Sequence, residues 1–326
     1  MAIDRAFFES TVKRYKRVRE SGTLKAKLIS RIGQKIPRIP IVSRLHEYIL
    51  LSRLIHFVKV AEKKYEYCQV LNVYKRNTLA MQIKSLLRQS ILPTKVIIYH
   101  NLSYLRSLWI PCRQDVVLYT HNPNWNAKYH GRFFNCLLVN LDYYVVWDDD
   151  INPGFLWNER TLELVREQGC IATANGRTLV PTRLDEIDFR YAQDIALPAS
   201  YFDYEDHLGD GCSIDSNTIV DYGGHSWTFT RSTLIDMVSI EPPSLENSED
   251  FHVSAAAYIR SGTKTIVLSQ DPLFPSTYPD LSFNSLAADA HASHRISPAS
   301  FLQERANIIQ SWVVSHGFLP VAKRHV

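Results

Sequence analysis

Short runs of β-branched and aromatic residues alternate with helix-forming segments in the first half of this chain of 326 residues. This alternation limits the fold more than any other feature, because strands that alternate with helices pair in parallel through helical crossovers. We therefore expect an α/β fold with a mostly parallel central sheet, helices on both faces and a binding site at the carboxyl ends of the strands. The expected strands are residues 69–74, 95–99, 116–119 and 143–147, with helices expected over 79–89 and 127–140.

The composition excludes several classes of protein. With 45% hydrophobic and 21% charged residues, the chain is neither an intrinsically disordered protein nor a fibrous one. Its five cysteines are far apart and include no C-x-x-C pair, which argues against a disulfide scaffold or a structural zinc site. There is no apolar run of 18 residues and no secretory leader pattern, so we expect a cytoplasmic protein.

The charge is distributed unevenly along the chain. Residues 1–66 hold 16 Lys and Arg against 6 Asp and Glu, a net charge of +10, which leaves −6 on the remainder. We expect residues 1–66 to be a basic, amphipathic helical extension that docks on an anionic membrane surface, with the protein peripheral on the cytoplasmic face of the inner membrane. The alternative is a pair of solvated helices that pack on the body or on a second copy. No nucleic-acid recognition motif accompanies the charge, so no nucleic-acid partner is expected.

Three consecutive carboxylates, Asp148, Asp149 and Asp150, directly follow the apolar run at 143–147. Such carboxylates repel one another unless a cation or hydrogen-bond donors neutralise them. A hard divalent ion, Mg²⁺ or Mn²⁺, held by one or two carboxylates together with substrate phosphate oxygens, would do so. The alternative is a solvated acidic loop before the turn at residues 152–154.

From about residue 68 to residue 295, the order of these motifs resembles that of a GT-A nucleotide-sugar glycosyltransferase. The likeness is to glycosyltransferase family 2 and to the exostosin-like enzymes. The stretches VLNVYKRNTLAMQIKSLLRQ, KVIIYHN and HGRFFNCLLVNLDYYVVWDDD are similar to the nucleotide-binding half and the D-x-D motif of that family. The resemblance implies a nucleotide site at Tyr74, Arg76 and Asn101. It implies further donor contacts from Arg132, Asp148 and Asp149, and a metal ligand at Asp150.

Two later motifs extend the resemblance. The sequence DYGGHSW, residues 221–227, resembles the glycine-rich loop for the acceptor and the donor sugar, through Gly223, Gly224, His225 and Trp227; an ordinary turn is the alternative. Ser248-Glu249-Asp250 opens a helix and resembles the x-E-D motif, in which Asp250 would be the general base beside Glu249. For this motif the alternative is an electrostatic helix cap. His291 and His294 are the candidates for a late metal-binding histidine, and solvent-exposed histidines are the alternative.

The sequence thus predicts an enzyme of three parts: the extension at 1–66, a GT-A catalytic domain at 67–296 and a helical tail at 297–326. The expected reaction transfers a sugar from a nucleotide-sugar to a glycan or lipid-linked acceptor, as in lipopolysaccharide, O-antigen or capsule synthesis. Two alternatives stay open. A sugar-phosphate nucleotidyltransferase would carry a glycine-rich loop after the first strand, where residues 74–77 (YKRN) have none. A non-catalytic glycan-binding module would not need both acidic motifs.

Overall fold

The computed structural model describes residues 40–74, 78–101, 115–121, 127–149, 151, 153–179, 204–207, 216–269 and 298–324. The chain divides into two compact units, residues 1–46 and 47–326, and the β-sheet belongs to the second unit. Its strands are β1 (Tyr67–Val73), β2 (Lys95–His100), β3 (Val117–His121), β4 (Tyr143–Trp147), β5 (Ile171–Leu179), β6 (Tyr204–His207), β7 (Thr218–Val220), β8 (Tyr222–Thr230) and β9 (Thr265–Val267).

The helices are mostly short. They are α3 (Pro40–Val60), α4 (Leu79–Leu86), α5 (Gly131–Phe134), α6 (Trp157–Gln168), α8 (Arg231–Val238), α9 (Glu249–Ser261) and α12 (Pro298–Ser315). Single 3₁₀ turns, η1 (Asn135–Leu138) and η3 (Val321–Lys323), complete the helical elements of the described chain. The segment expected as one helix over 127–140 is therefore α5 continued by η1, and it ends before Asn140.

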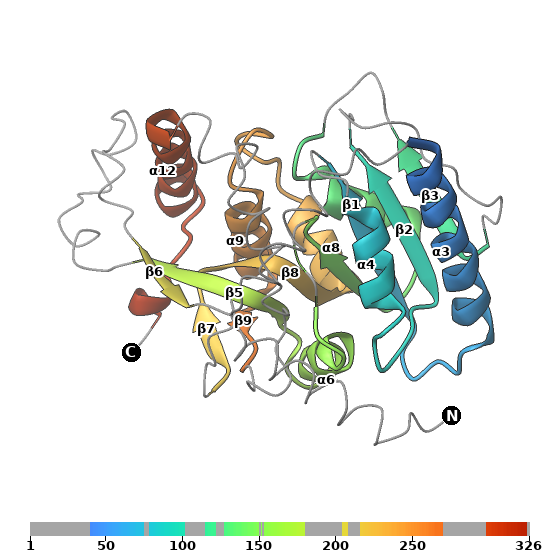
Figure 1. Cartoon of the computed structure of the whole chain (residues 1–326). Coiled ribbons are helices and arrows are strands. Elements are labelled where there is room, and N and C mark those ends of the chain that lie inside the picture. The colour runs from blue at the N-terminus through green and yellow to red at the C-terminus, as the bar shows by residue number, and fades with distance from the viewer. Residues whose placement is uncertain are drawn as a thin grey trace, which may run out of the picture. The chain divides into compact units, whose positions relative to one another are not determined.

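The strands form one mixed sheet in the order β3-β2-β1-β4-β8-β5-β9-β7, with β6 beside β5 (Figure 1). Strands β3, β2, β1 and β4 are parallel, β8 is antiparallel to both of its neighbours, and β5 is parallel to β9. Six of these nine strands run in one direction, so the prediction of a mostly parallel α/β sheet is confirmed. The order along the sheet reverses between β1 and β4, where ligands of such folds bind.

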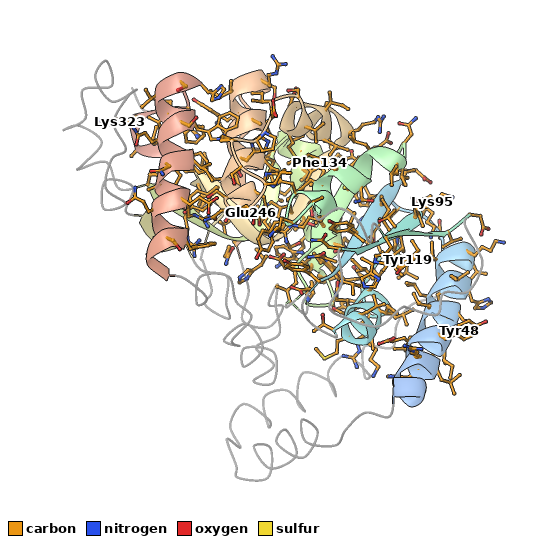
Figure 2. All side chains as sticks on the ribbon, turned by 90° about the horizontal axis from the view of Figure 1, so that it is seen from above. Tyr48, Lys95, Tyr119, Phe134, Glu246 and Lys323 are labelled. Carbon is orange, nitrogen blue, oxygen red and sulfur yellow. The ribbon has the colours of Figure 1, made fainter. Side chains whose placement is uncertain are left out.

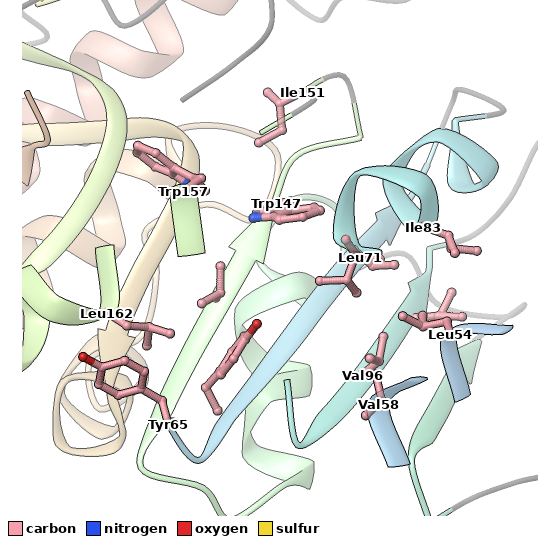
Figure 3. Packing of buried hydrophobic residues seen from close by; sticks show 14 of the residues in the cluster. Leu54, Val58, Tyr65, Leu71, Ile83, Val96, Trp147, Ile151, Trp157 and Leu162 are labelled. Atoms are coloured by element: carbon pink, nitrogen blue, oxygen red, sulfur yellow. The ribbon is translucent and has the colours of Figure 1, made fainter. Parts of the chain in front are cut away.

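Both faces of the sheet are covered, because strands of a parallel sheet bury side chains on both sides. All seven residues of β1 are buried. Leu71 and Val73 point into a core with α3, α4 and α6, whereas Cys68 and Val70 point into a core with α5 and α8. Figure 3 shows the first of these cores. The period-two alternation of the strand therefore sets which helix layer each residue contacts.

Helix α3 belongs to the sheet's own core. Five of its apolar side chains are buried with those of α4, β2 and β3: Leu50, Leu51, Leu54, Ile55 and Val58. In Figure 3, Leu54 and Val58 lie beside Val96 of β2 and Ile83 of α4. The compact unit that holds the sheet begins at Glu47. From Glu47 onward this helix belongs to that unit, because one of its faces is apolar enough to cover the sheet.

The C-terminal helix is also packed. Ala306, Ile309 and Trp312 of α12 are buried in a third core, with Phe251 and Ala255 of α9. Among the described residues, no helix is long and apolar enough to cross a membrane.

Candidate active site

Antiparallel pairing of β4 with β8 brings two of the predicted motifs together. Trp147, the last residue of β4, pairs with Ser226 of β8, so the carboxylates that follow β4 lie beside the segment Gly223–His225. The backbone N–H of Asp148 donates to the carbonyl of His225 at 2.9 Å. The motifs are more than 70 residues apart in the chain, and the strand register places them at one edge of the sheet.

A pocket of about 110 Å³ opens at this edge. Its lining residues come from the end of β4, from β5, from β8, from α5 and from the start of α9. They are Arg132, Asp148, Asn175, Gly176, Arg177, Tyr222, Gly223, Gly224, His225, Trp227, Glu249 and Asp250. Eight of these twelve residues were singled out in the sequence, and they belong to three separate motifs and α5.

Arg132 connects the two acidic motifs. Its side chain is only 2% exposed, and its guanidinium donates to Oδ1 of Asp148 and, at 2.6 Å, to Oε1 of Glu249. The guanidinium carbon also lies 4.5 Å from the centre of the Trp227 ring. Burial opposes the charge on this arginine, but the surrounding carboxylates outweigh burial and raise its pKa. A positive charge is therefore fixed between β4 and α9.

Asp250 is paired with a different arginine, which lies on the C-terminal helix α12. Arg305 of α12 donates to Oδ2 of Asp250 at 2.5 Å, and its guanidinium carbon lies 5.0 Å from the Tyr222 ring centre. The N–H of Phe251 donates to Oδ1 of the same carboxylate at 2.8 Å. Both carboxylate oxygens of Asp250 are thus hydrogen-bonded, which holds this side chain in one orientation.

These different partners separate the pKa values of the two adjacent carboxyl groups. Burial raises the pKa of Glu249 to about 7, since the attraction of Arg132 offsets it only in part and Asp250 and Asp148 add to the rise. Burial also opposes the charge on Asp250, but Arg305 and then Arg177 outweigh it and lower the pKa of that group. Asp250 is therefore ionised at neutral pH, whereas Glu249 holds its proton more readily than a free glutamic acid does.

Strained backbone surrounds the pocket. Lys128, His225 and Ser248 have φ angles of 47°, 64° and 60°, and they are the non-glycine residues with positive φ in the described ranges. His225 lines the pocket, Ser248 directly precedes Glu249, and Lys128 precedes α5. Each such residue costs about 1–3 kcal/mol and persists only where the surrounding structure holds it. One of these residues lines the pocket and another directly precedes a lining residue, so backbone strain is concentrated at this edge of the sheet.

The two glycines of the DYGGHSW motif lie within strand β8, whereas we expected a loop. A Cβ atom on Gly223 would lie 2.1 Å from the side chain of Thr173, and one on Gly224 would lie 2.3 Å from Asn175 Oδ1. Side chains of the neighbouring strand β5 therefore occupy the space, and packing between strands is reason enough for both glycines. Close approach of a ligand, the basis of the prediction, is not needed to explain them.

Other predicted residues lie nearby without lining this pocket. Tyr74 and Asn101 lie directly after β1 and β2, where Tyr74 packs edge-on against Tyr129 and Asn101 Nδ2 donates to the Lys128 carbonyl at 2.9 Å. Asp149 is 5% exposed. Four further predicted site residues, Arg76, Asp150, His291 and His294, lie outside the described residues. In the part of the chain that is described, no group of three or more His, Cys, Asp or Glu could hold a metal ion.

Five pocket or near-pocket residues were missed by the sequence reasoning: Asn175, Gly176, Arg177, Tyr222 and Arg305. Asn175, Gly176 and Arg177 lie on β5, which is the neighbour of β8 only through the sheet order. Arg305 lies 55 residues beyond its partner Asp250, on the C-terminal helix, for which no site residue was predicted. The signal in the sequence was an arginine among the apolar helix positions Phe301, Ala306, Ile309 and Trp312.

Comparison with protein-family models gives no match. No curated protein matches the chain either. Function is therefore inferred from the geometry of the site and from the order of the motifs.

Beside the site, two histidines are buried in the contact between α5 and α9. His130 and His252 are each 1% exposed, and their ring centres are 5.4 Å apart. Burial lowers the pKa of His130 to about 3, with further contributions from His252 and Arg132. Burial likewise lowers the pKa of His252 to about 4. Both rings are neutral in the folded protein at pH 7.

These two histidines should make the protein acid-sensitive. Their folded pKa values lie below the unfolded value of about 6.5. The free energy of unfolding is therefore highest above that pH and falls as the pH drops toward 4, because the unfolded state takes up protons that the folded state does not. At pH 5 each ring is expected to lower the free energy of unfolding by about 2 kcal/mol. Urea unfolding of the wild type and of His252→Leu at pH 7 and pH 5 tests this. The loss between the two pH values should be about 2 kcal/mol smaller in the variant; equal losses would contradict the assignment.

Proposed function

We propose that this protein is a nucleotide-sugar glycosyltransferase of the GT-A type, which transfers a sugar to a glycan or lipid-linked acceptor in cell-envelope polysaccharide synthesis. The observation that carries the proposal is the convergence of three sequence motifs on one pocket. Asp148 after β4, the DYGGHSW motif of β8 and the Glu249-Asp250 pair of α9 all line it. If the three motifs were only a solvated acidic loop, an ordinary turn and a helix cap, they would not be expected to line the same pocket.

The place of the pocket in the sheet supports a nucleotide donor. Ligands of open α/β sheets bind outside the carboxyl ends of the strands, where the strand order reverses. That point lies between β1 and β4, and Tyr74 and Asp148 directly follow these two strands. We propose that the nucleotide lies across these ends and that the sugar extends toward Glu249 and Asp250.

Two roles follow for the paired carboxyl groups of α9. A general base works best when its pKa is near the working pH and it can accept a proton. Glu249, with a pKa of about 7, meets this condition better than Asp250, whose pKa is lowered and whose two oxygens are already hydrogen-bonded. We therefore propose that Glu249 accepts the proton and that Asp250 holds the charge of Arg305 beside Tyr222. This differs from the resemblance, which implies Asp250 as base.

The proposed step is a single displacement. The acceptor hydroxyl gives its proton to Glu249 as its oxygen forms a bond to the anomeric carbon, and the bond from that carbon to the diphosphate oxygen breaks. This reaction inverts the anomeric configuration; exostosin-like enzymes, to which the sequence is also similar, retain it. Arg132 donates hydrogen bonds to both Asp148 and Glu249, and its positive charge offsets part of their negative charge.

Asp150 would hold the metal ion implied by the resemblance. The donor set fits a hard cation in kind, because the residues after β4 offer carboxylate oxygens and Mg²⁺ is commonly held by one or two carboxylates plus substrate phosphates. Asp148 is already paired with Arg132, so it is less available to a metal ion. When bound, the ion would offset negative charge on the leaving diphosphate.

The first experiment measures the melting temperature of the full chain with UDP, GDP, CMP and dTDP, each with and without Mn²⁺. A ligand that binds only the folded state raises stability, by about 2.7 kcal/mol at one hundred times its dissociation constant. We expect one nucleotide to raise the melting temperature in the presence of Mn²⁺, and Asp148→Asn to reduce this rise. Asp236→Asn, which changes a carboxylate of α8 that does not line the pocket, is the control. If no nucleotide shifts the wild type, the proposal loses its main support.

A further inference from the structure

Helix α3 presents two different faces. From Glu47 onward, its buried side chains occupy one half of the helix circumference and cover the sheet. The other half is exposed, yet it carries large apolar residues. Tyr48, Ile49, Phe57 and Val60 are 40%, 49%, 43% and 64% exposed. Figure 2 shows side chains standing on both sides of this helix, with Tyr48 labelled. We call residues 48, 49, 53, 56, 57, 59 and 60 the outer face of α3.

The charge on the outer face has one sign. Its charged residues, Arg53 and Lys59, are both basic and exposed, and it also carries the exposed His56 and no carboxylate. The acidic residue of α3, Glu47, lies on the buried half and is 3% exposed. Lys59 forms an ion pair with Asp115, 3.3 Å away, in which both side chains are about half exposed. Exposed apolar groups interspersed with basic ones mark a helix that contacts a partner with an apolar layer beneath negative charge.

The distribution of charge along the whole chain favours the same partner. Residues 1–39, which directly precede α3, hold 11 Lys and Arg against 3 Asp and Glu, whereas residues 67–326 have a net charge of −6. An anionic surface therefore attracts the region of α3 and repels the rest of the protein. The outer face belongs to the helix that directly follows this basic stretch in the chain.

Two other occupants fit less well. Residues 1–39 could cover the outer face, but they are themselves basic and would meet Arg53 and His56 without a compensating charge. A second copy related by a two-fold axis would bring one basic face against another, with no carboxylate on either face to compensate the charge. Only a negatively charged partner complements both the apolar and the basic residues of this face.

We propose that the outer face of α3 docks on an anionic phospholipid bilayer, with Ile49, Phe57 and Val60 inserted among the headgroups and Arg53 and His56 at the phosphates. The buried half of the helix stays packed on the sheet, so the catalytic unit is held directly at the bilayer by its own core helix. The docking does not depend on the proposed reaction, because vesicle binding needs neither donor nor acceptor.

The test is co-sedimentation of the full chain with vesicles of phosphatidylcholine alone and of phosphatidylcholine mixed with phosphatidylglycerol. We expect binding only to the anionic vesicles, and we expect the double variant Ile49→Ser, Phe57→Ser to weaken it by about tenfold or more. Arg53→Glu should weaken it most at low salt, since screening removes charge effects. Ile235→Ser is the matched control, because Ile235 is 46% exposed on α8, which covers the opposite face of the sheet.

The outcomes distinguish the three candidate partners of the outer face, which are an anionic bilayer, residues 1–39 and a second copy of the chain. Loss of binding in the α3 variants, with binding unchanged in Ile235→Ser and melting temperatures unchanged in all, supports the proposal. Three results overturn it: absence of binding by the wild type, equal binding by the double variant, and a wild-type dimer that the double variant dissociates without any vesicle effect. A full chain with Lys13, Arg14, Lys16, Arg17 and Arg19 changed to Gln should retain the sensitivity to Ile49→Ser, Phe57→Ser. Loss of that sensitivity would assign the binding to residues 1–39 instead.

Discussion

Replacement of Glu249 by glutamine is expected to lower kcat of sugar transfer by about 10²–10⁴, the usual contribution of a general base. Glutamine keeps the size of the side chain and can still accept a hydrogen bond from Arg132, but it cannot take a proton from an acceptor hydroxyl. Nucleotide binding should change little, because the step affected is proton transfer. The measurement is kcat for transfer from the donor that the nucleotide panel identifies, together with the melting-temperature shift for its nucleotide.

The pH profile distinguishes the two adjacent carboxyl groups. With Glu249 as base, the wild-type kcat should rise with pH through about 7, since this group must lose its proton to act, and its folded pKa is raised to that value. With Asp250 as base, kcat would be flat from pH 6 to 8, because the pKa of that group is lowered. Glu246→Gln is the control, since Glu246 is 60% exposed and pairs with Lys128 outside the pocket. A flat profile combined with an active Glu249→Gln enzyme would return the role to Asp250.

The second large effect is on stability. Arg132→Met is expected to lower the free energy of unfolding at pH 7.5 by about 3–5 kcal/mol, because removal of one partner leaves buried carboxylates uncompensated. Methionine retains much of the side-chain volume against Trp227, so the loss reports mainly on charge. Urea unfolding of the variant measures it. Arg166→Met is the control, since Arg166 is 54% exposed, and its pair with Glu167 should contribute less than about 1 kcal/mol.

A second substitution tests the cause of that loss. In the double variant Arg132→Met, Glu249→Gln, one of the two stranded charges is removed, so part of the lost stability should return. A double variant no more stable than Arg132→Met would show that the arginine acts by packing on Trp227 and Phe133 and not by pairing.

Much of the parallel half of the sheet could be predicted from local patterns. The run at 143–147 is β4 with the expected bounds, and the run at 95–99 is β2 with one more residue. These strands have short apolar runs between turn residues, which identify them without knowledge of their neighbours. The resemblance predicts a loop for the glycine motif, which lies instead within strand β8. Its packing against β5 could not be predicted, because a contact between strands leaves no local periodicity.

The sequence alone determined the chemical groups of the candidate site and the order in which they occur. Apolar strands followed by carboxylates, and a helix that starts with Glu249 and Asp250, are local features, and each predicts where polar groups emerge. The tertiary structure decided which of these groups meet. Arg132 and Glu249 are 117 positions apart, and Asp250 and Arg305 are 55 positions apart. Pairing at such separations depends on β8 lying beside β4 and on α12 packing against α9. For this reason the unequal pKa values of two adjacent carboxyl groups follow only from the folded protein, since each value depends on burial and on partners from distant elements.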